Sequence, residues 1–129
     1  MPRKSLGVTQ RTRAPKRGDV RPALTLRVDL GRRGALGPGK INLLEAIDAE
    51  GSITAAGKKL GMSYRRAWLL VESVNGMFKE PAVSTRHGGA NGGKASLTRF
   101  GAEVVARYRQ IEKAAEKSAN KHLTFLGGA

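Results

Sequence analysis

The chain has 129 residues, with 24 Lys and Arg against 10 Asp and Glu, which gives a formal net charge of +14 at pH 7. A charge of this size in one small domain is usually balanced by a polyanionic partner, most often a nucleic acid. The chain has no cysteine, which excludes disulfides and thiolate metal sites. No apolar run approaches the ~20 residues that cross a bilayer, and because the first five residues lack an apolar core we expect no secretion signal.

The N-terminal residues 1–20 differ in composition from the rest of the chain. They contain six Lys and Arg, one acid, two prolines and no apolar periodicity. This composition is typical of a disordered basic arm. The arm either follows a phosphate backbone or acts as a solubilising tail. After it we expect one folded domain over residues 21–119 and a short tail over residues 120–129.

Strict alternation of apolar and polar residues over residues 24–30 predicts a half-buried strand. Residues 31–34 are expected to turn the chain into a short second strand at residues 35–36. Pro38 is well placed for the first position of a helix that ends at Gly51. The apolar stripe of this helix consists of Ile41, Leu44 and Ile47.

Residues 52–78 predict two helices joined by a short turn. Ser52 and Ser63 are suited to cap them, and Gly61 breaks the chain between them. Small residues occur where the two helices would cross, which a generic amphipathic pair does not require. This arrangement is typical of a helix-turn-helix. The small residues are Ala56, Gly57 and Ala67, and the apolar face of the second helix consists of Ala67, Leu70, Val71, Val74 and Phe78.

Residues 82–86 and 95–97 are expected to form a hairpin around the glycine-rich loop 87–94. Such a hairpin directly after the two helices is typical of a wing. Thr98 is expected to cap a long helix whose apolar stripe exceeds the needs of a core of this size. The stripe either forms a dimer interface or packs within the chain. The expected interface residues are Phe100, Val104, Tyr108 and Ile111.

The stretch from Gly51 to Trp68 resembles the LysR-like winged helix-turn-helix. More narrowly, it is similar to the N-terminal DNA-binding domain of ModE-type molybdate-dependent transcriptional regulators. Gly37–Lys40, the glycine-rich loop and Leu97–Gly101 share this similarity, which covers about residues 24–117. The resemblance implies sequence-specific DNA binding by a symmetric dimer. The family's C-terminal molybdate-binding domains are expected to be absent. Only the resemblance therefore suggests molybdate as an effector, and no residue of this sequence does.

The start of the second helix of the pair carries the residues that the resemblance presents to DNA. The planar guanidinium groups of Arg65 and Arg66 either read guanine or clamp phosphates. Tyr64 either contacts DNA or packs, and Trp68 either lines the groove or covers the edge of the core. The expected DNA-binding residues are Thr54, Lys58, Lys59, Ser63, Tyr64, Arg65, Arg66, Trp68, Arg86 and Lys94.

Catalytic chemistry has little support in the sequence. Gly88–Lys94 matches the spacing of a phosphate-binding P-loop, but Ala95 stands where that loop needs Ser or Thr. No catalytic triad or metal-ligand grouping occurs elsewhere. We therefore expect no enzyme activity, no metal and no cofactor.

The expected fold class is mainly α with small β elements: a winged helix-turn-helix with an N-terminal β-hairpin and a long C-terminal dimerisation helix. The expected function is a sequence-specific transcriptional regulator that binds double-stranded DNA as a homodimer. Its recognition helix would enter the major groove, and its wing would contact the adjacent backbone or minor groove. The alternative is a nucleoid-type architectural protein of low specificity, and composition alone also permits a ribosome-associated protein. We expect a bacterial cytoplasmic, nucleoid-associated protein with no membrane partner.

Overall fold

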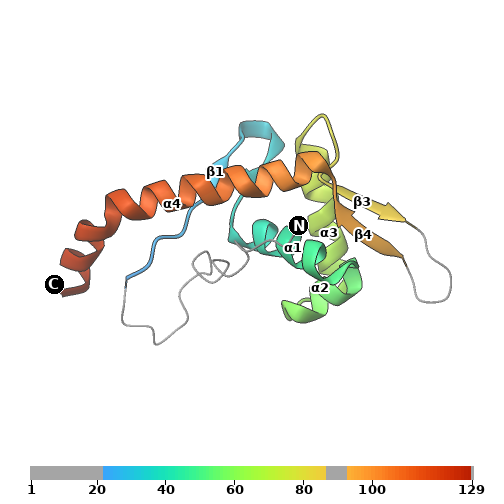
Figure 1. Cartoon of the computed structure of the whole chain (residues 1–129), viewed down its shortest axis with the longest axis horizontal. Helices are drawn as coiled ribbons and strands as arrows, with labels where there is room; N and C mark the ends of the chain where they lie inside the picture. The colour runs from blue at the N-terminus through green and yellow to red at the C-terminus, as the bar shows by residue number, and fades with distance from the viewer. Residues whose placement is uncertain (1–21, 87–92, 129) are drawn as a thin grey trace.

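The computed structural model describes residues 22–86 and 93–128 (Figure 1). Within these ranges the chain forms two small sheets and four α-helices, in the order β1, β2, α1, α2, α3, β3, β4, α4. The predicted basic arm over residues 1–20 lies outside the described residues, as does most of the predicted loop of the hairpin. The predictions for these two segments stay predictions.

The N-terminal segment is extended but pairs only briefly. β1 (Val28–Asp29) and β2 (Ala35–Leu36) form an antiparallel ladder, and the short 3-10 helix η2 (Gly31–Arg33) connects them. The strand predicted from residue 24 is too long, because β2 offers only two residues as partners. Residues 24–30 still alternate between half-buried and exposed side chains. The alternation over residues 24–30 therefore predicts which side chains are buried, but it does not predict how many residues pair with a neighbouring strand.

α1 (Pro38–Glu50) is the central helix of the core. All three residues of its predicted apolar stripe are fully buried, which confirms that stripe. Leu43 is buried as well, because α2, α3, α4 and β4 contact α1 from several sides. The helix ends as predicted at Gly51, whose φ of 79° is left-handed and whose N–H donates to the Ile47 carbonyl at 2.9 Å.

α2 (Ile53–Lys59) and α3 (Tyr64–Met77) are joined by a short turn. Both predicted caps are confirmed. The Ser52 Oγ accepts a hydrogen bond from the third backbone N–H of its helix at 3.0 Å, and the Ser63 Oγ does the same for α3 at 3.1 Å. Each cap satisfies a backbone donor that the helix itself leaves unpaired.

The close approach of α2 to α3 depends on small residues. A Cβ added at Gly57 would lie 3.2 Å from the Cβ of Ala67. Gly61, in the turn between the helices, has a φ of 71°, a conformation that favours glycine. The predicted crossing of small residues is therefore present.

β3 (Val83–Arg86) and β4 (Lys94–Leu97) form the second antiparallel sheet, as the hairpin prediction required. Asn75 of α3 holds the start of β3. Its Oδ1 accepts from the N–H groups of Ala82 and Val83 at 2.8 and 3.0 Å, and its Nδ2 donates to the Val83 carbonyl at 3.1 Å. One side chain thus ties the sheet to α3.

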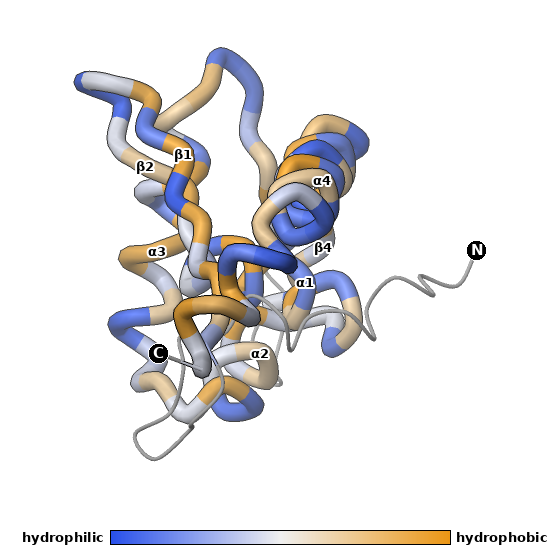
Figure 2. Tube along the Cα trace, turned by 90° about the vertical axis from the view of Figure 1, so that its left-hand side faces the viewer, coloured by the Kyte–Doolittle hydropathy of each residue, from blue (hydrophilic) through white to orange (hydrophobic). Residues whose placement is uncertain are grey.

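α4 (Arg99–Gly128) begins after its predicted cap, Thr98, whose Oγ1 accepts from the Gly101 N–H at 2.9 Å. The first half of α4 lies across the core, and the second half extends beyond it to the C-terminus (Figure 1). Hydrophobic and hydrophilic residues alternate around the helix, which Figure 2 views nearly along its axis. The helix includes residues 120–128 of the predicted tail, since no proline interrupts it.

The expected fold class, a winged helix-turn-helix with a dimerisation helix, is corrected by this arrangement. The described residues form a mainly helical protein with two separate two-stranded antiparallel sheets. In the described ranges no third strand joins β3 and β4, and the loop expected to form the wing, residues 87–92, lies outside them. The sequence pattern predicted most individual elements but not this overall class.

Candidate functional site

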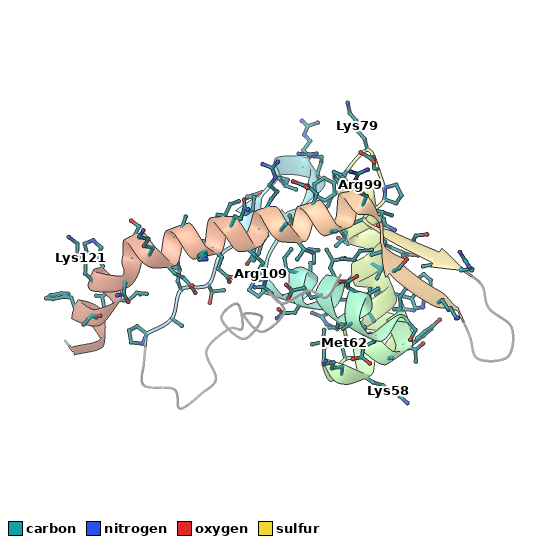
Figure 3. The ribbon with its side chains drawn as sticks, in the orientation of Figure 1. Lys58, Met62, Lys79, Arg99, Arg109 and Lys121 are labelled. Carbon is teal, nitrogen blue, oxygen red and sulfur yellow. The ribbon has the colours of Figure 1, made fainter. Side chains whose placement is uncertain are left out.

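The end of α2 and the start of α3 form a cationic surface, which we call the α2–α3 face. It consists of five exposed residues, Lys58, Lys59, Tyr64, Arg65 and Arg66. α3 has no acid in its first turn, and no carboxylate of the described chain pairs with either arginine. Lys58 projects away from the body of the molecule (Figure 3). The first turn of α3 adds partial positive charge at the same place, so this face attracts anions.

Three predicted contact residues play differing parts at this face. The Lys59 Nζ lies 3.3 Å from the Glu50 Oε2, but this ion pair is exposed and contributes little stability. The contact with Glu50 therefore holds Lys59 only weakly. Ser63 is the cap of α3, so its side chain shapes the face by fixing the helix start. Thr54 is exposed on α2.

Tyr64 and Trp68 lie one helical turn apart on α3 and differ in exposure. Tyr64 is 57% exposed, whereas Trp68 is half-buried and packs against the hydrophobic core. Their rings meet edge to face with centroids 6.1 Å apart. Trp68 therefore packs at the edge of the core, and the other role expected for it, lining a DNA groove, stays a prediction. The phenol of Tyr64 remains available to a ligand.

Arg86 and Lys94 are directly opposite each other at the open end of the β3–β4 ladder. Both side chains are exposed. They flank residues 87–92, so any contact that they make with a ligand comes from the ends of β3 and β4.

The residues expected at a dimer interface lie mostly inside the single chain. Tyr108 is 1% exposed and its hydroxyl donates to the Leu26 carbonyl at 2.7 Å. Val104 is buried, and Phe100 packs edge to face on Phe78 with centroids 5.2 Å apart. Only Ile111, 47% exposed, remains on the surface. The structure thus shows the alternative reading, packing within the chain, for three of the four residues.

Sequence reasoning missed a buried network of charges between α1 and α4. Arg109 donates from Nε to the Glu45 Oε2 at 2.9 Å, from Nη2 to the Glu45 Oε1, and from Nη1 to the Glu112 Oε1 at 3.0 Å. Its Nη2 also donates to the Asn42 Oδ1 at 3.2 Å. The spacing of Arg109 and Glu112 on one helix face was the only local signal for it.

The network is almost completely shielded from solvent. The side chains of Arg109, Glu45 and Glu112 are 9%, 5% and 4% exposed. Burial raises the pKa of the Glu112 carboxyl above its ordinary value, while the hydrogen bond from Arg109 lowers it in part and the charges of Glu116 and Glu45 raise it further. Burial also raises the pKa of Tyr108. The Glu112 Oε2 has no hydrogen-bond partner in the described part of the chain.

The described chain is thus a basic helical protein with an exposed cationic face and a buried charge network. No family model matches it. It is 42% identical over 89 residues to the molybdenum transport protein ModE of Azotobacter vinelandii, covering 69% of this chain and 32% of that protein. It is 38% identical over 93 residues to the molybdenum-pterin-binding protein MopA of Rhodobacter capsulatus, covering 70% and 35%.

A third relative is the DNA-binding transcriptional dual regulator ModE of Escherichia coli K12. The identity is 33% over 81 residues, which cover 63% of this chain and 31% of the regulator. The chain therefore spans about a third of the length of the curated relatives it matches. By their names, these relatives connect it with molybdenum and with transcription regulation.

The family resemblance inferred from the sequence is corrected by these comparisons. The expected assignment was a LysR-like winged helix-turn-helix closest to the DNA-binding domain of ModE-type regulators. No family model supports it, and the relatives comprise molybdenum-pterin-binding proteins as well as ModE proteins. The printed names of these relatives link the chain to molybdenum and do not mention a LysR-like fold.

The expected function is corrected for the same reason. The expectation was a homodimeric, sequence-specific transcriptional regulator, with a nucleoid-type architectural protein as its alternative, and it gave molybdate only as an effector suggested by resemblance. Three of the relatives are named for molybdenum transport or molybdenum-pterin binding, and each alignment covers about a third of the relative, so DNA-binding regulation by this chain is not shown. In residues 22–86 and 93–128, no helix combines the length and apolar character needed to cross a membrane.

Proposed function

We propose that the chain acts in molybdenum-linked gene regulation and that its α2–α3 face binds double-stranded DNA. The observation that carries the proposal is the pair Arg65 and Arg66, exposed at the start of α3 and without carboxylate partners among the described residues. The molybdenum and regulatory links are supported by the names of the relatives. The place of action that fits this proposal is the cytoplasm, at the nucleoid.

The expected binding is electrostatic. Duplex DNA carries one negative charge per ~1.7 Å of its axis, and each neutralised phosphate releases a counterion. The four cations of the α2–α3 face predict a slope of log K against log salt of about −3.6, at about −0.9 for each contact. Tyr64 adds a hydroxyl donor for a phosphate oxygen. Thr54, Arg86 and Lys94 are proposed as additional contacts at the edges of this face.

The test is fluorescence anisotropy of a labelled duplex at several salt concentrations. Arg65→Ala with Arg66→Ala should weaken binding and make the salt slope shallower by about 1.8, since two phosphate contacts are lost. Arg107→Ala is the matched control, because Arg107 is also exposed but pairs with Glu103 on α4. The double variant removes two charges and the control removes one. If Arg107→Ala changes the salt slope by half as much as the double variant does, the α2–α3 face is not the binding surface.

A second candidate function is the binding of a molybdenum oxyanion by this chain itself. It is favoured by the relatives MopA and MopB of Rhodobacter capsulatus, named as molybdenum-pterin-binding proteins and 38% and 41% identical. The guanidinium groups of Arg65 and Arg66 suit a tetrahedral dianion as well as a phosphate. Calorimetry with molybdate, and with sulfate as the control, tests it. A stoichiometric heat with molybdate alone supports this candidate, and equal responses to both anions contradict it.

We also propose that the chain forms a homodimer through the exposed part of α4. Ile111, Phe125 and Leu126 are 47%, 73% and 62% exposed. Phe125 and Leu126 lie beyond Glu112, the last buried residue of α4, and Ile111 is exposed within the part of α4 that packs on the core. Apolar side chains of this size are commonly covered by a partner when they recur along one helix. A second copy would double the number of cations presented to one duplex.

A further inference from the structure

Four exposed cations gather at the end of α3 that lies opposite the α2–α3 face. We call this surface the η2–α4 face, and it consists of Arg32, Arg33, Lys79 and Arg99 around the rings of Phe78 and Phe100. α3 has 14 residues, so at 1.5 Å of rise per residue its two ends are about 20 Å apart. Lys79 and Arg99 lie at one end of the molecule and Lys58 lies at the other (Figure 3). The η2–α4 face is therefore a separate surface.

Contacts between distant segments hold the η2–α4 face together. Arg33 donates from Nη1 to the Met77 carbonyl at 3.2 Å, and its Cζ lies 5.9 Å from the centre of the Phe78 ring. Phe78 in turn packs edge to face on Phe100, with ring centroids 5.2 Å apart. Lys79 directly follows the first of these rings in the sequence, and the cation of α4 directly precedes the second. Three segments thus build this face: η2, the end of α3 and the start of α4.

The electrostatics of the η2–α4 face favour an anionic partner. Among the described residues, no ion pair involves any of its four cations. Glu80 and Asp29 offset part of the charge, but the Asp29 carboxylate already accepts a hydrogen bond from the Gly31 N–H at 3.0 Å. α4 begins here, so its first turn adds partial positive charge, and the hydrogen bond from Arg33 offsets the negative end of α3.

We propose that the η2–α4 face binds an acidic segment of a partner protein. The proposal goes beyond the proposed function and does not require it, because the two faces are separate. Phe78 and Phe100 are half-buried, so both rings keep some exposed surface among the cations. Aromatic residues and arginine are enriched in protein–protein interfaces, whereas a phosphate backbone is bound through cations and hydrogen-bond donors. We therefore expect a partner segment that combines Asp or Glu with apolar residues.

The test uses the full isotope-labelled chain and two synthetic peptides. In the first peptide glutamates alternate with leucines and phenylalanines, and in the second they alternate with serines. The first peptide should change the amide chemical shifts most at residues 32–33, 78–80 and 99–100. It should also bind more tightly than the second, because its apolar side chains cover the two rings. Shift changes centred on residues 58–66, or equal affinity for both peptides, would overturn the proposal.

Charge reversal separates the η2–α4 face from the net charge of the protein. Arg32→Glu with Lys79→Glu should weaken binding of the first peptide about tenfold, since two exposed ion pairs are replaced by repulsion. Both side chains are exposed, and Arg33 is left unchanged because it contributes to packing at the end of α3. Lys117→Glu with Lys121→Glu, on the exposed part of α4, changes the net charge equally and should leave the affinity almost unchanged. An equal loss in the two double variants would contradict the proposal.

Two other partners for this face are distinguished by the same variants. Fluorescence anisotropy of a labelled duplex should respond to Arg32→Glu with Lys79→Glu no more than to the control. A larger loss would make the face a nucleic-acid contact and overturn the proposal. The sedimentation coefficient of this variant should equal that of the wild-type chain, whereas a shift towards a smaller species would assign the face to a second copy instead.

Discussion

Replacing Arg109 with methionine should destabilise the protein strongly, because it leaves two buried carboxylates without their shared cation. Arg109 makes two hydrogen bonds to Glu45, one to Glu112 and one to Asn42. Hydrogen bonds to charged groups contribute ~1.5–3 kcal/mol each, but these share one network and do not add. Removal of one partner from a buried ion pair costs about 3–5 kcal/mol, and we expect a loss in that range.

The loss should also depend on pH. Burial already raises the pKa of Glu112, and Arg109 lowers it in part. Without Arg109 the folded-state pKa of Glu112 rises further above its unfolded value. A folded state that binds a proton more tightly than the unfolded state loses stability as pH rises through the raised pKa. The destabilisation of Arg109→Met should therefore be larger at pH 8 than at pH 5.

Urea denaturation followed by circular dichroism at pH 5 and pH 8 measures both effects. Arg107→Met is the matched control on the same helix; its side chain is 73% exposed, and we expect a change within ~0.5 kcal/mol. Replacing Arg109, Glu45 and Glu112 together by leucine should restore most of the stability, since apolar packing often substitutes for a buried ion network. A loss below about 1 kcal/mol for Arg109→Met, equal at both pH values, would refute the reasoning.

Three other predictions follow from packing, hydrogen bonding and exposure. Gly101→Ala should lower stability by about 3 kcal/mol in thermal melting, because the new Cβ would lie 2.0 Å from the Ala82 carbonyl oxygen; an unchanged melting temperature would contradict it. Asn75→Ala should cost roughly 2–4 kcal/mol in urea, since two backbone N–H groups at the start of β3 lose their acceptor, and Asn75→Asp, which keeps that acceptor, should cost less. Ile111→Asp should shift sedimentation towards a monomer, whereas an unchanged sedimentation coefficient would exclude Ile111 from a dimer contact.

Local signals in the sequence were sufficient for most of the helices and their ends. Ser52, Ser63 and Thr98 cap their helices through hydrogen bonds that span three residues. Gly51 and Gly61 end or separate helices because their backbone adopts positive φ, which other residues rarely do. These interactions depend on neighbours along the chain, so composition and spacing suffice to predict them.

The tertiary structure decided the features that join distant parts of the chain. Arg109 and Glu45 are 64 positions apart, and the Tyr108 hydroxyl reaches the Leu26 carbonyl 82 positions away, so no spacing rule connects them. The apolar stripe of α4 was visible in the sequence, but a stripe is equally apolar whether it faces its own core or a second copy. Only the position of α4 across α1 placed Val104 and Tyr108 inside the chain and left Ile111 outside. The strand predicted over residues 24–30 shows the same limit, because alternation determines which side chains are buried, whereas pairing depends on the length of the neighbouring strand.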